Sequence, residues 1–272
     1  MIDATARVAD GARLGAGVEI GPYCIVGPDV ALGDGVRLIA NVYLTGVTLI
    51  GEGTVVYPFA SLGTPPQSVH YRGGATRLVV GRGCELREGV TMNTGTEDGG
   101  GITSVGERCL LMVGCHVGHD CRVGNSVIFA NNVVLGGHVT VGDHTFLGGH
   151  AAVHQHVRIG EGAMMAGLSG ASGDIIPFGY ALGQIADLVG LNVVGLRRRG
   201  AARAELHRLR RAYRALFFGA GVFAERVDAV TREFGDDPLV GKIVAFIKAG
   251  GKRPLVQPPA GQRGDETGDD AS

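Results

Sequence analysis

Seven of the nine histidines of this chain fall within a short central stretch: His116, His119, His138, His144, His150, His154 and His156. Imidazole titrates near neutrality and can therefore serve as a general base. Asp120 directly follows His119, and a carboxylate beside an imidazole fixes its tautomer and favours its charged form. Consecutive residues of a strand point to opposite faces, so the sequence alone does not assure this contact. The histidines could also merely fill polar surface positions, or they could bind zinc.

These histidines lie in a sequence that repeats with a period of six residues. Apolar residues occupy every sixth position from Val8 to Leu62, again from Val80 to Met92, and, one residue out of phase, from Val105 to Met165. Glycine, which accounts for 48 of the 272 residues, often follows them. This period matches neither a helix nor a simple strand. It predicts a short strand and a corner on each side of a prism, and the 24 apolar positions on three sides predict eight coils.

The length of a coil decides which residues are neighbours in space. Three sides of six residues give coils of about 18 residues, so positions 18 apart should stack in adjacent coils. His138 and His156 have this spacing, and His119 lies 19 residues before His138. We therefore expect these histidines to converge on one groove along an edge of the prism.

Two interruptions of the repeat predict loops that leave the coils. Residues 63–79 and 93–104 are rich in Pro, Gly and polar residues, and loops on a rigid scaffold often carry function. Beyond the repeat, the sequence pattern changes first to the spacing of helices and then to a composition typical of disorder. We expect a β-helix domain over residues 1–190, a helical domain over 191–250 and a disordered tail over 251–272, where Pro, Gly and charge dominate.

The helical domain is predicted from its apolar spacing. Leu206, Leu209 and Tyr213 would share one face of a helix. Asp236 or Asp237, just before Pro238, is typical of the start of a further helix.

The composition narrows the classes of function. A formal net charge of −1 and the lack of a basic run argue against nucleic-acid binding. No apolar stretch approaches the ~20 residues that span a bilayer, so we expect no stable membrane insertion. The five cysteines form no CxxC pair, and their odd number favours reduced thiols in a cytoplasmic protein.

Three runs of sequence resemble the UDP-N-acetylglucosamine 3-O-acyltransferase family: LLMVGCHVGHDCRVGN (residues 110–125), ANNVVLGGHVTVGD (130–143) and GLNVVGLRRRG (190–200). The resemblance covers about residues 1–250. It implies a mainly β fold, namely a left-handed parallel β-helix of hexapeptide repeats with an α-helical C-terminal segment. The left hand follows from the family and not from the spacing, since parallel crossovers are usually right-handed. The family also implies a homotrimer, in which the flat sides of the prism pack against copies of the chain.

The resemblance implies an enzyme that transfers a 3-hydroxyacyl chain from acyl carrier protein to the 3-hydroxyl of UDP-N-acetylglucosamine, the first step of lipid A biosynthesis. His119 would be the general base, and the backbone N–H of Gly137 would stabilise the thioester oxyanion. No metal or other cofactor is implied, because a thioester is already activated. The substrate-binding positions implied by the family are Gln67, His70, His116, Asp120, His138, His154 and Gln155.

Further positions are implied at the C-terminal side. Asn192 would hold uracil, and Arg198 or Arg199 would meet the diphosphate, unless these arginines only form a solvated helix start. Gly167 matches the position that gauges acyl-chain length, where a small residue favours a longer chain. The arginines from Arg197 to Arg214, with Lys242, Lys248 and Lys252, form a basic segment that could dock the acidic carrier protein or simply face solvent.

The loops depart from the family pattern. Ser68 and His70 stand where the family has Asp and Lys, and Thr94 stands where it has Arg. These changes leave open a diverged acyltransferase with another nucleotide-sugar acceptor, for example a 3-amino sugar. A zinc-dependent hydratase of the same fold and a scaffold without catalytic activity are further alternatives. An acetyl-CoA-dependent sugar acetyltransferase is a rival that the GLNVVGLRRRG run at residues 190–200 argues against.

Overall fold

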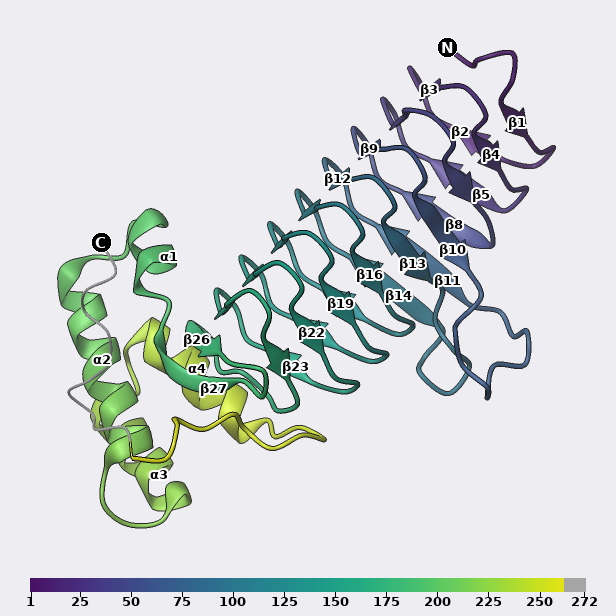
Figure 1. Ribbon diagram of the computed structural model, residues 1–272. Coiled ribbons are helices and arrows are strands. Elements are labelled where there is room, and N and C mark those ends of the chain that lie inside the picture. The colour runs from purple at the N-terminus through teal and green to yellow at the C-terminus, as the bar shows by residue number, and fades with distance from the viewer. Residues whose placement is uncertain (262–272) are drawn as a thin grey trace.

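The computed structural model describes residues 1–261, which form a three-sided prism of stacked coils with four helices packed at its C-terminal end (Figure 1). The chain winds as a left-handed parallel β-helix, as the family resemblance implies. Each side of the prism is one sheet, and consecutive strands of the chain pass from sheet to sheet. Strands β1 to β24 complete the eight predicted coils, and β25 begins another.

The first sheet contains β1 (Arg7–Val8), β4 (Ile25–Val26), β7 (Tyr43–Leu44), β10 (Ser61–Thr64), β13 (Thr91–Asn93), β16 (His116–Val117), β19 (Val134–Leu135), β22 (Ala152–Val153) and β25 (Gly170–Ala171). The second contains β2 (Arg13–Leu14), β5 (Val30–Leu32), β8 (Val47–Ile50), β11 (Arg77–Val80), β14 (Ile102–Val105), β17 (Arg122–Val123), β20 (Thr140–Val141) and β23 (Arg158–Ile159). The third contains β3 (Glu19–Ile20), β6 (Arg37–Leu38), β9 (Val55–Val56), β12 (Glu85–Leu86), β15 (Leu110–Leu111), β18 (Ile128–Phe129), β21 (Phe146–Leu147), β24 (Met164–Met165), β26 (Gly179–Leu182) and β27 (Asp187–Leu191). Only the last pair of this sheet, β26 and β27, is antiparallel among the described strands.

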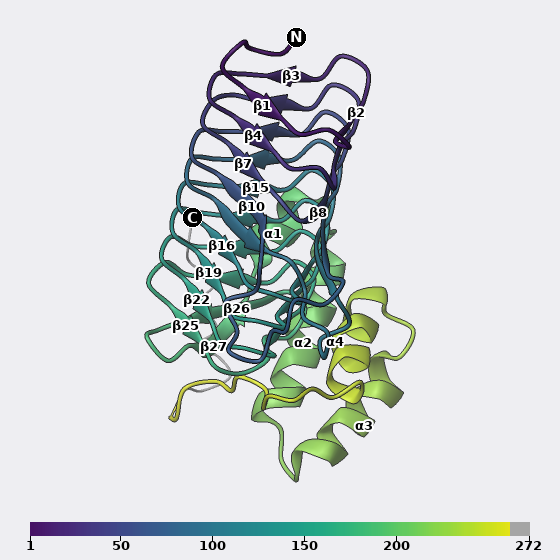
Figure 2. The same ribbon diagram turned by 90° about the vertical axis from the view of Figure 1, so that its right-hand side faces the viewer.

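The strand register locates the two inserted loops. Arg7 pairs with Ile25, a separation of 18 residues, whereas Ser61 pairs with Thr91 across 30. The next coil is also longer than the rest, since Thr91 pairs with His116 across 25 residues. The extra residues lie at 65–76, between β10 and β11, and at 94–101, between β13 and β14. They fall within the predicted loops, and both leave the prism at the same edge (Figures 1 and 2).

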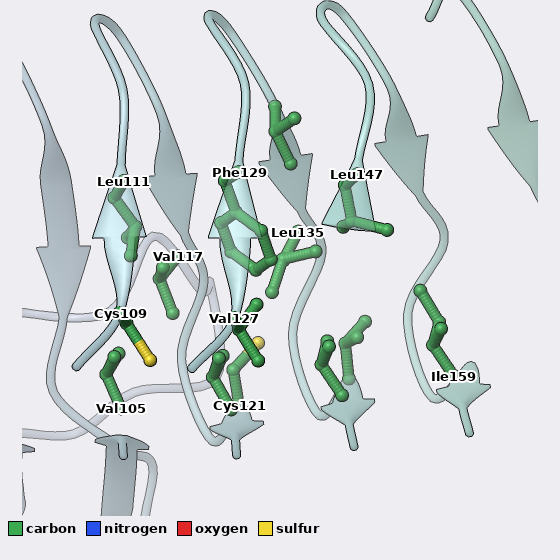
Figure 3. Packing of buried hydrophobic residues seen from close by; sticks show 14 of the residues in the cluster. Val105, Cys109, Leu111, Val117, Cys121, Val127, Phe129, Leu135, Leu147 and Ile159 are labelled. Atoms are coloured by element: carbon green, nitrogen blue, oxygen red, sulfur yellow. The ribbon is translucent and has the colours of Figure 1, made fainter. Parts of the chain in front are cut away.

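Two inward positions per six residues fill the prism. The predicted aliphatic positions are buried, as for Leu111 and Leu135, which are fully enclosed (Figure 3). Residues two places earlier are buried too, and all five cysteines occupy such positions: Cys24, Cys84, Cys109, Cys115 and Cys121. Burial raises the pKa of the Cys115 thiol to about 11 and that of Cys121 to about 12. The cysteines therefore pack as small, buried side chains in the core.

The helical segment comprises α1 (Val193–Arg198), α2 (Arg203–Phe218), α3 (Phe223–Phe234) and α4 (Pro238–Lys248). Leu206, Leu209 and Tyr213 are buried on one face of α2, which confirms the predicted spacing. The Tyr213 hydroxyl donates to the carbonyl oxygen of Leu188 at 3.3 Å and so ties α2 to β27. Asp237, not Asp236, caps α4 by accepting hydrogen bonds from two backbone N–H groups of its first turn.

The prediction of a disordered tail is wrong for residues 251–261. Leu255 forms a parallel bridge with Asp174, and Val256 is only 8% exposed. Composition cannot show that the last coil provides hydrogen-bond partners for the backbone of this segment and an apolar surface against which it packs. Residues 262–272 of the predicted tail lie outside the described part of the chain. No helix in residues 1–261 is long and apolar enough to cross a membrane.

Candidate active site

The corner between β16 and β17 brings His119 and Asp120 into contact. Asp120, His138 and His156 stack at equivalent corners of successive coils, each in the left-handed conformation, with φ of 60°, 62° and 66°. Asp and His adopt this conformation more readily than most residues. Because Asp120 turns there and does not continue a strand, its side chain meets that of its neighbour, and its Oδ2 lies 2.8 Å from His119 Nδ1. The contact that strand alternation could not assure is therefore made.

The loop at residues 94–101 holds the Asp120 carboxylate in place. Thr96 donates its backbone N–H to Oδ1 at 2.9 Å and its hydroxyl to Oδ2 at 2.6 Å. The Asp120 N–H in turn donates to the Thr103 hydroxyl at 2.8 Å. A Cβ at Gly95 or Gly99 would overlap the carboxylate, so these glycines allow the loop to close over it. The carboxylate is 1% exposed and is aimed at the imidazole.

The hydrogen bond to Asp120 decides which nitrogen of His119 carries the proton. An ionised carboxylate only accepts, so Nδ1 of His119 carries the proton and Nε2 keeps its lone pair. The His119 side chain keeps 12% of its surface exposed. This arrangement suits removal of a proton from a hydroxyl group.

Gly137 lies directly beside this imidazole in the next coil. A Cβ at this position would overlap the His119 ring, so only glycine lets the ring rest against the backbone. The Gly137 carbonyl oxygen accepts the His156 N–H at 3.1 Å. Within residues 1–261 no acceptor takes the Gly137 N–H, which is therefore available to an oxygen beside His119.

The rings of His119, His138 and His156 lie next to one another in successive coils, as their spacing predicts. The rings of His119 and His138 meet edge to face with centroids 5.0 Å apart, and those of His138 and His156 stack at 4.5 Å. Burial lowers the pKa of His138 against the opposing pull of Asp120, and burial and neighbouring cations lower the pKa of His156. His116 lies on β16 with its Nδ1 2.8 Å from the Thr91 hydroxyl, and burial lowers its pKa as well. These rings are favoured in their neutral form and can both donate and accept.

The loop at residues 65–76 carries Gln67 and His70, both exposed. Its end is tied to the second loop, since the Gly74 N–H donates to Glu97 Oε1 at 2.5 Å and the Thr76 hydroxyl to Thr94 Oγ1 at 2.9 Å. Thr94 is 3% exposed and so serves as part of the junction between the two loops.

The positions implied for the nucleotide lie at another corner. Asn192 caps α1, accepting the Gly195 N–H at 2.9 Å, and donates its side-chain N–H to the carbonyl oxygen of Gly162 at 2.9 Å. The Arg199 guanidinium packs against Gly162, where a Cβ would overlap it. Arg198 is exposed. Within one chain, the structure does not bring these residues to His119, and the Asn192 amide already has partners inside the chain.

Gly167 lies at the remaining kind of corner, between β24 and β25, and is exposed. A Cβ there would stand 3.2 Å from the Gly149 carbonyl oxygen, which leaves room for a side chain after a small shift.

Three ligand-forming groups gather at the His119 corner. His119, Asp120 and His138 each offer one atom, and these atoms lie within 4.8 Å of one another. They could hold a metal ion, as the zinc hypothesis requires. The Asp120 oxygens, however, already accept hydrogen bonds from Thr96 and His119. This arrangement favours a histidine–carboxylate pair over a metal site.

Sequence reasoning missed several residues that complete the site. Thr91 and Thr96 meet His116 and Asp120, but hydroxyl residues in loops and strands give no signal that would single them out. Arg253, within the segment predicted to be disordered, donates from Nη2 to His154 Nδ1 at 2.6 Å and from Nε to the Gln155 carbonyl oxygen at 2.9 Å.

The stacked parallel coils and a histidine–carboxylate pair at one corner define a transferase of the hexapeptide-repeat class. The model for bacterial transferase hexapeptide repeats matches residues 102–137, and the model described as UDP N-acetylglucosamine O-acyltransferase, domain 2, matches residues 174–256. The chain is 61% identical, over 96% of both chains, to the acyl-[acyl-carrier-protein]–UDP-N-acetylglucosamine O-acyltransferase of Azorhizobium caulinodans. It is 49% identical, over 95% of both chains, to the protein of that name from Rhizobium johnstonii. The chain therefore belongs to the acyl-[acyl-carrier-protein]–UDP-N-acetylglucosamine O-acyltransferase family and is an acyltransferase.

Solved structures agree with this assignment. A crystal structure of UDP-N-acetylglucosamine acyltransferase superposes with a TM-score of 0.92 at 36% identity and covers 96% of this chain and 100% of that one. UDP-N-acetylglucosamine acyltransferase from Campylobacter jejuni gives a TM-score of 0.90 at 37% identity and covers 95% and 100%. The resemblance found in the sequence is thereby confirmed for both family and fold.

Proposed function

We propose that the protein transfers a 3-hydroxyacyl chain from acyl carrier protein to the 3-hydroxyl of UDP-N-acetylglucosamine, the first step of lipid A biosynthesis. The observation that carries the proposal is the pairing of His119 with Asp120 beside the unbonded N–H of Gly137. A base and an oxyanion donor on adjacent coils are the two groups that acyl transfer from a thioester needs. Relatives that are 61% and 49% identical bear the name of this activity.

The reaction follows from the geometry of the pair. Nε2 of His119 takes the proton of the acceptor hydroxyl as its oxygen attacks the thioester carbonyl carbon. The carbonyl oxygen becomes an oxyanion, and the Gly137 N–H donates to it. The carbon–sulfur bond then breaks, and the leaving thiolate of the carrier takes the proton from the imidazolium. Asp120 stabilises this imidazolium and keeps the ring in the reactive tautomer. The thioester is already activated, so we propose that no metal or other cofactor takes part.

The remaining positions would bind the substrates. Gln67, His70, His116, His138, His154 and Gln155 line the groove or the loops beside it, and Asn192, Arg198 and Arg199 would hold the uridine diphosphate portion. These two groups lie at different corners of one chain. We propose a homotrimer, in which a neighbouring subunit supplies the second group. Exposed apolar side chains on the first sheet, including Tyr43 and Val134, offer a surface for this packing.

The helical segment offers a place for the carrier protein. A shallow depression beside α2 is lined by Arg197, Ala201, Arg203, Leu206 and Arg210. Two further cations of the segment are paired with carboxylates of the same chain, Arg208 with Asp237 and Lys242 with Glu161. We propose that an acidic acyl carrier protein docks at this depression, and that the reaction occurs in the cytoplasm, where the carrier and the nucleotide sugar are found together.

The first loop favours a second candidate acceptor. The His70 N–H donates to the Ser68 hydroxyl at 3.3 Å, so the two positions where the family has Asp and Lys form a small turn without a carboxylate and an ammonium group. Without that pair of charges, the acceptor could carry a 3-amino group in place of the 3-hydroxyl. Gly167 would remain the gauge of acyl-chain length with either acceptor.

An assay of acyl transfer tests the proposal. Wild-type protein is incubated with 3-hydroxyacyl carrier proteins of several chain lengths and with the 3-hydroxyl or the 3-amino acceptor. His119→Ala should reduce kcat by about a thousandfold or more. His144→Ala is the matched control, because His144 occupies a left-handed corner with φ of 59° but is exposed and lies outside the groove. Full activity of His119→Ala would contradict the mechanism, and transfer to the amino acceptor alone would establish the second candidate.

A further inference from the structure

The segment Gly251–Gln257, here named the C-terminal strap, returns from α4 to the last coils (Figures 1 and 2). The Asp174 N–H donates to the Pro254 carbonyl oxygen at 2.7 Å, and the Val256 N–H donates to the Asp174 carbonyl oxygen at 2.9 Å. The Leu188 N–H donates to the Gln257 carbonyl oxygen at 2.9 Å. With Val256 buried, the strap is fixed to the β-helix from Pro254 to Gln257.

The strap places the Arg253 guanidinium on His154. Two of its N–H groups are used, one on His154 Nδ1 at 2.6 Å and one on the Gln155 carbonyl oxygen at 2.9 Å. His154 Nδ1 lies 2.6 Å from Arg253 Nη2 and 3.3 Å from the Gln155 carbonyl oxygen. A guanidinium donates only, so the shorter contact requires Nδ1 to accept, which places the ring proton on Nε2. His154 is exposed and would otherwise rotate freely about its side-chain bonds. The hydrogen bond to Nδ1 restrains the ring, and the hydrogen bond to the Gln155 carbonyl oxygen fixes the guanidinium that makes it.

His154 and Gln155 belong to the same edge as the proposed base. Gln155 lies at the corner position that Gly137 and His119 occupy in the two preceding coils, and its side chain packs 3.1 Å from the place of a Cβ at Gly136. Two coils correspond to roughly 10 Å along the prism. A donor at this distance from the reacting hydroxyl would meet a part of a substrate away from the bond being made.

We propose that Arg253 is a positioning residue of the acyl-transfer site, which holds His154 as a fixed N–H donor to an oxygen of a bound substrate. The oxygen belongs to the nucleotide sugar or to the phosphopantetheine arm of the carrier. Lys252, next to Arg253 on the strap, adds a positive charge that helps lower the pKa of His138 and His156. A positive edge of this kind suits the phosphate groups that both substrates carry. The inference rests on the proposed function.

The first test compares Arg253→Ala with Arg253→Lys in the acyl-transfer assay, with Arg232→Ala, an exposed arginine of α3, as the control. Arg253→Ala should lower kcat/KM by about tenfold, because the donor loses its fixed orientation. Arg253→Lys should recover only part of this, since one ammonium cannot make both contacts in the same geometry. The melting temperature should stay unchanged, because the strap keeps its backbone hydrogen bonds. A rise in KM for only one substrate identifies which one His154 meets. Wild-type kinetics for Arg253→Ala would overturn the proposal.

A double-mutant cycle separates positioning from direct binding. In His154→Gln the amide nitrogen can donate near the place of Nε2 without an acceptor at the place of Nδ1. Arg253→Ala should therefore cost much less in the His154→Gln background than in the wild type. Equal losses in both backgrounds would show that Arg253 does not act through His154.

A measurement without substrate keeps this inference apart from the proposed function. The ¹⁵N shifts of the His154 ring, assigned by their loss in His154→Gln, should show an unprotonated Nδ1 in wild type and an altered ring in Arg253→Ala. If wild-type protein is inactive with both acceptors while these shifts appear as expected, the proposed function fails and the contact stands. If Nδ1 is protonated in wild type, the positioning role is refuted whatever the activity.

Discussion

Two corners of the same prism share a backbone but differ in chemistry. Asp120 and His138 lie at one, and Asn132 and His150 at another, all with φ between 59° and 62°. At the first corner the ring of His119 is 12% exposed and bonded to a carboxylate. At the second, His150 is exposed and its Nε2 lies 3.4 Å from the Asn132 amide nitrogen.

The difference comes from the inserted loop. The repeat supplies left-handed corners along every edge, and His is well tolerated at such positions. Only the first corner is covered by residues 94–101, which bury a carboxylate and give it two hydrogen bonds from Thr96. We therefore propose that the regular coils set the spacing of the reacting groups and that the irregular insertion makes one of the corners reactive.

Removing the negative charge of Asp120, which distinguishes the first corner, should have the largest effect on kcat. Asp120→Asn keeps the size of the side chain but can present an amide N–H to Nδ1 of His119, which favours the wrong tautomer. We expect kcat to fall by about a thousandfold with little change in KM. Asp143→Asn is the matched control, because Asp143 accepts the Asn125 N–H at 2.7 Å at a corner without a base. Asp143→Asn should lower thermal stability and spare kcat, and the reverse pattern would contradict the distinction between the corners.

The Thr96 hydroxyl should account for much of the effect of the inserted loop on kcat. Thr96→Val removes the donor to Asp120 Oδ2 but keeps the backbone N–H to Oδ1, so the carboxylate loses part of its orientation. We expect kcat to fall by about tenfold, a shift in the pH dependence of kcat, and recovery of both in Thr96→Ser.

Thr145→Val provides the contrast for Thr96. The Thr145 hydroxyl is also buried, but it donates to the Gly142 carbonyl oxygen at 2.8 Å inside the prism. Its loss should lower the melting temperature without altering the pH profile. A Thr96→Val enzyme with a normal pH profile and only a lower melting temperature would assign Thr96 to stability alone.

Periodicity explains what the sequence could predict. The stacking of His138 on His156 follows from their 18-residue spacing, because coils of constant length place such positions in register. The second inward position, which holds all five cysteines, has the same period and could have been found from Val30, Val36 and Val42. The contact of Asp120 with Thr96 could not, since the path of an insertion is not periodic. The strap was missed because its composition resembles that of disordered segments, whereas its order comes from Asp174 and from the burial of Val256.

Acid should lower the free energy of unfolding through the half-buried ring of His116. Burial lowers the pKa of His116 below its usual value of about 6.5. The unfolded chain therefore binds more protons than the folded one in this range, and the free energy of unfolding rises with pH. The contribution of His116 is complete above about pH 6.5 and is lost as the pH falls through the lowered pKa of the folded state. Melting temperatures of wild type and His116→Gln between about pH 5.5 and 7 should show a flatter dependence for the variant, and parallel curves would mean that His116 is not the source.

Removal of metal ions should have no effect, which would sharpen the contrast between a histidine–carboxylate pair and a metal site. A zinc ion bound by His119, Asp120 and His138 would have to displace hydrogen bonds that Asp120 Oδ2 accepts from Thr96 and from His119. We expect dialysis against a chelator to leave kcat for acyl transfer unchanged, and elemental analysis of the purified protein to find far less than one zinc per chain. A stoichiometric zinc whose removal abolishes activity, and whose return restores it, would instead make the His119 corner a metal centre. Asp120 would then be a metal ligand and not the partner of a general base. Thr96 would orient that ligand.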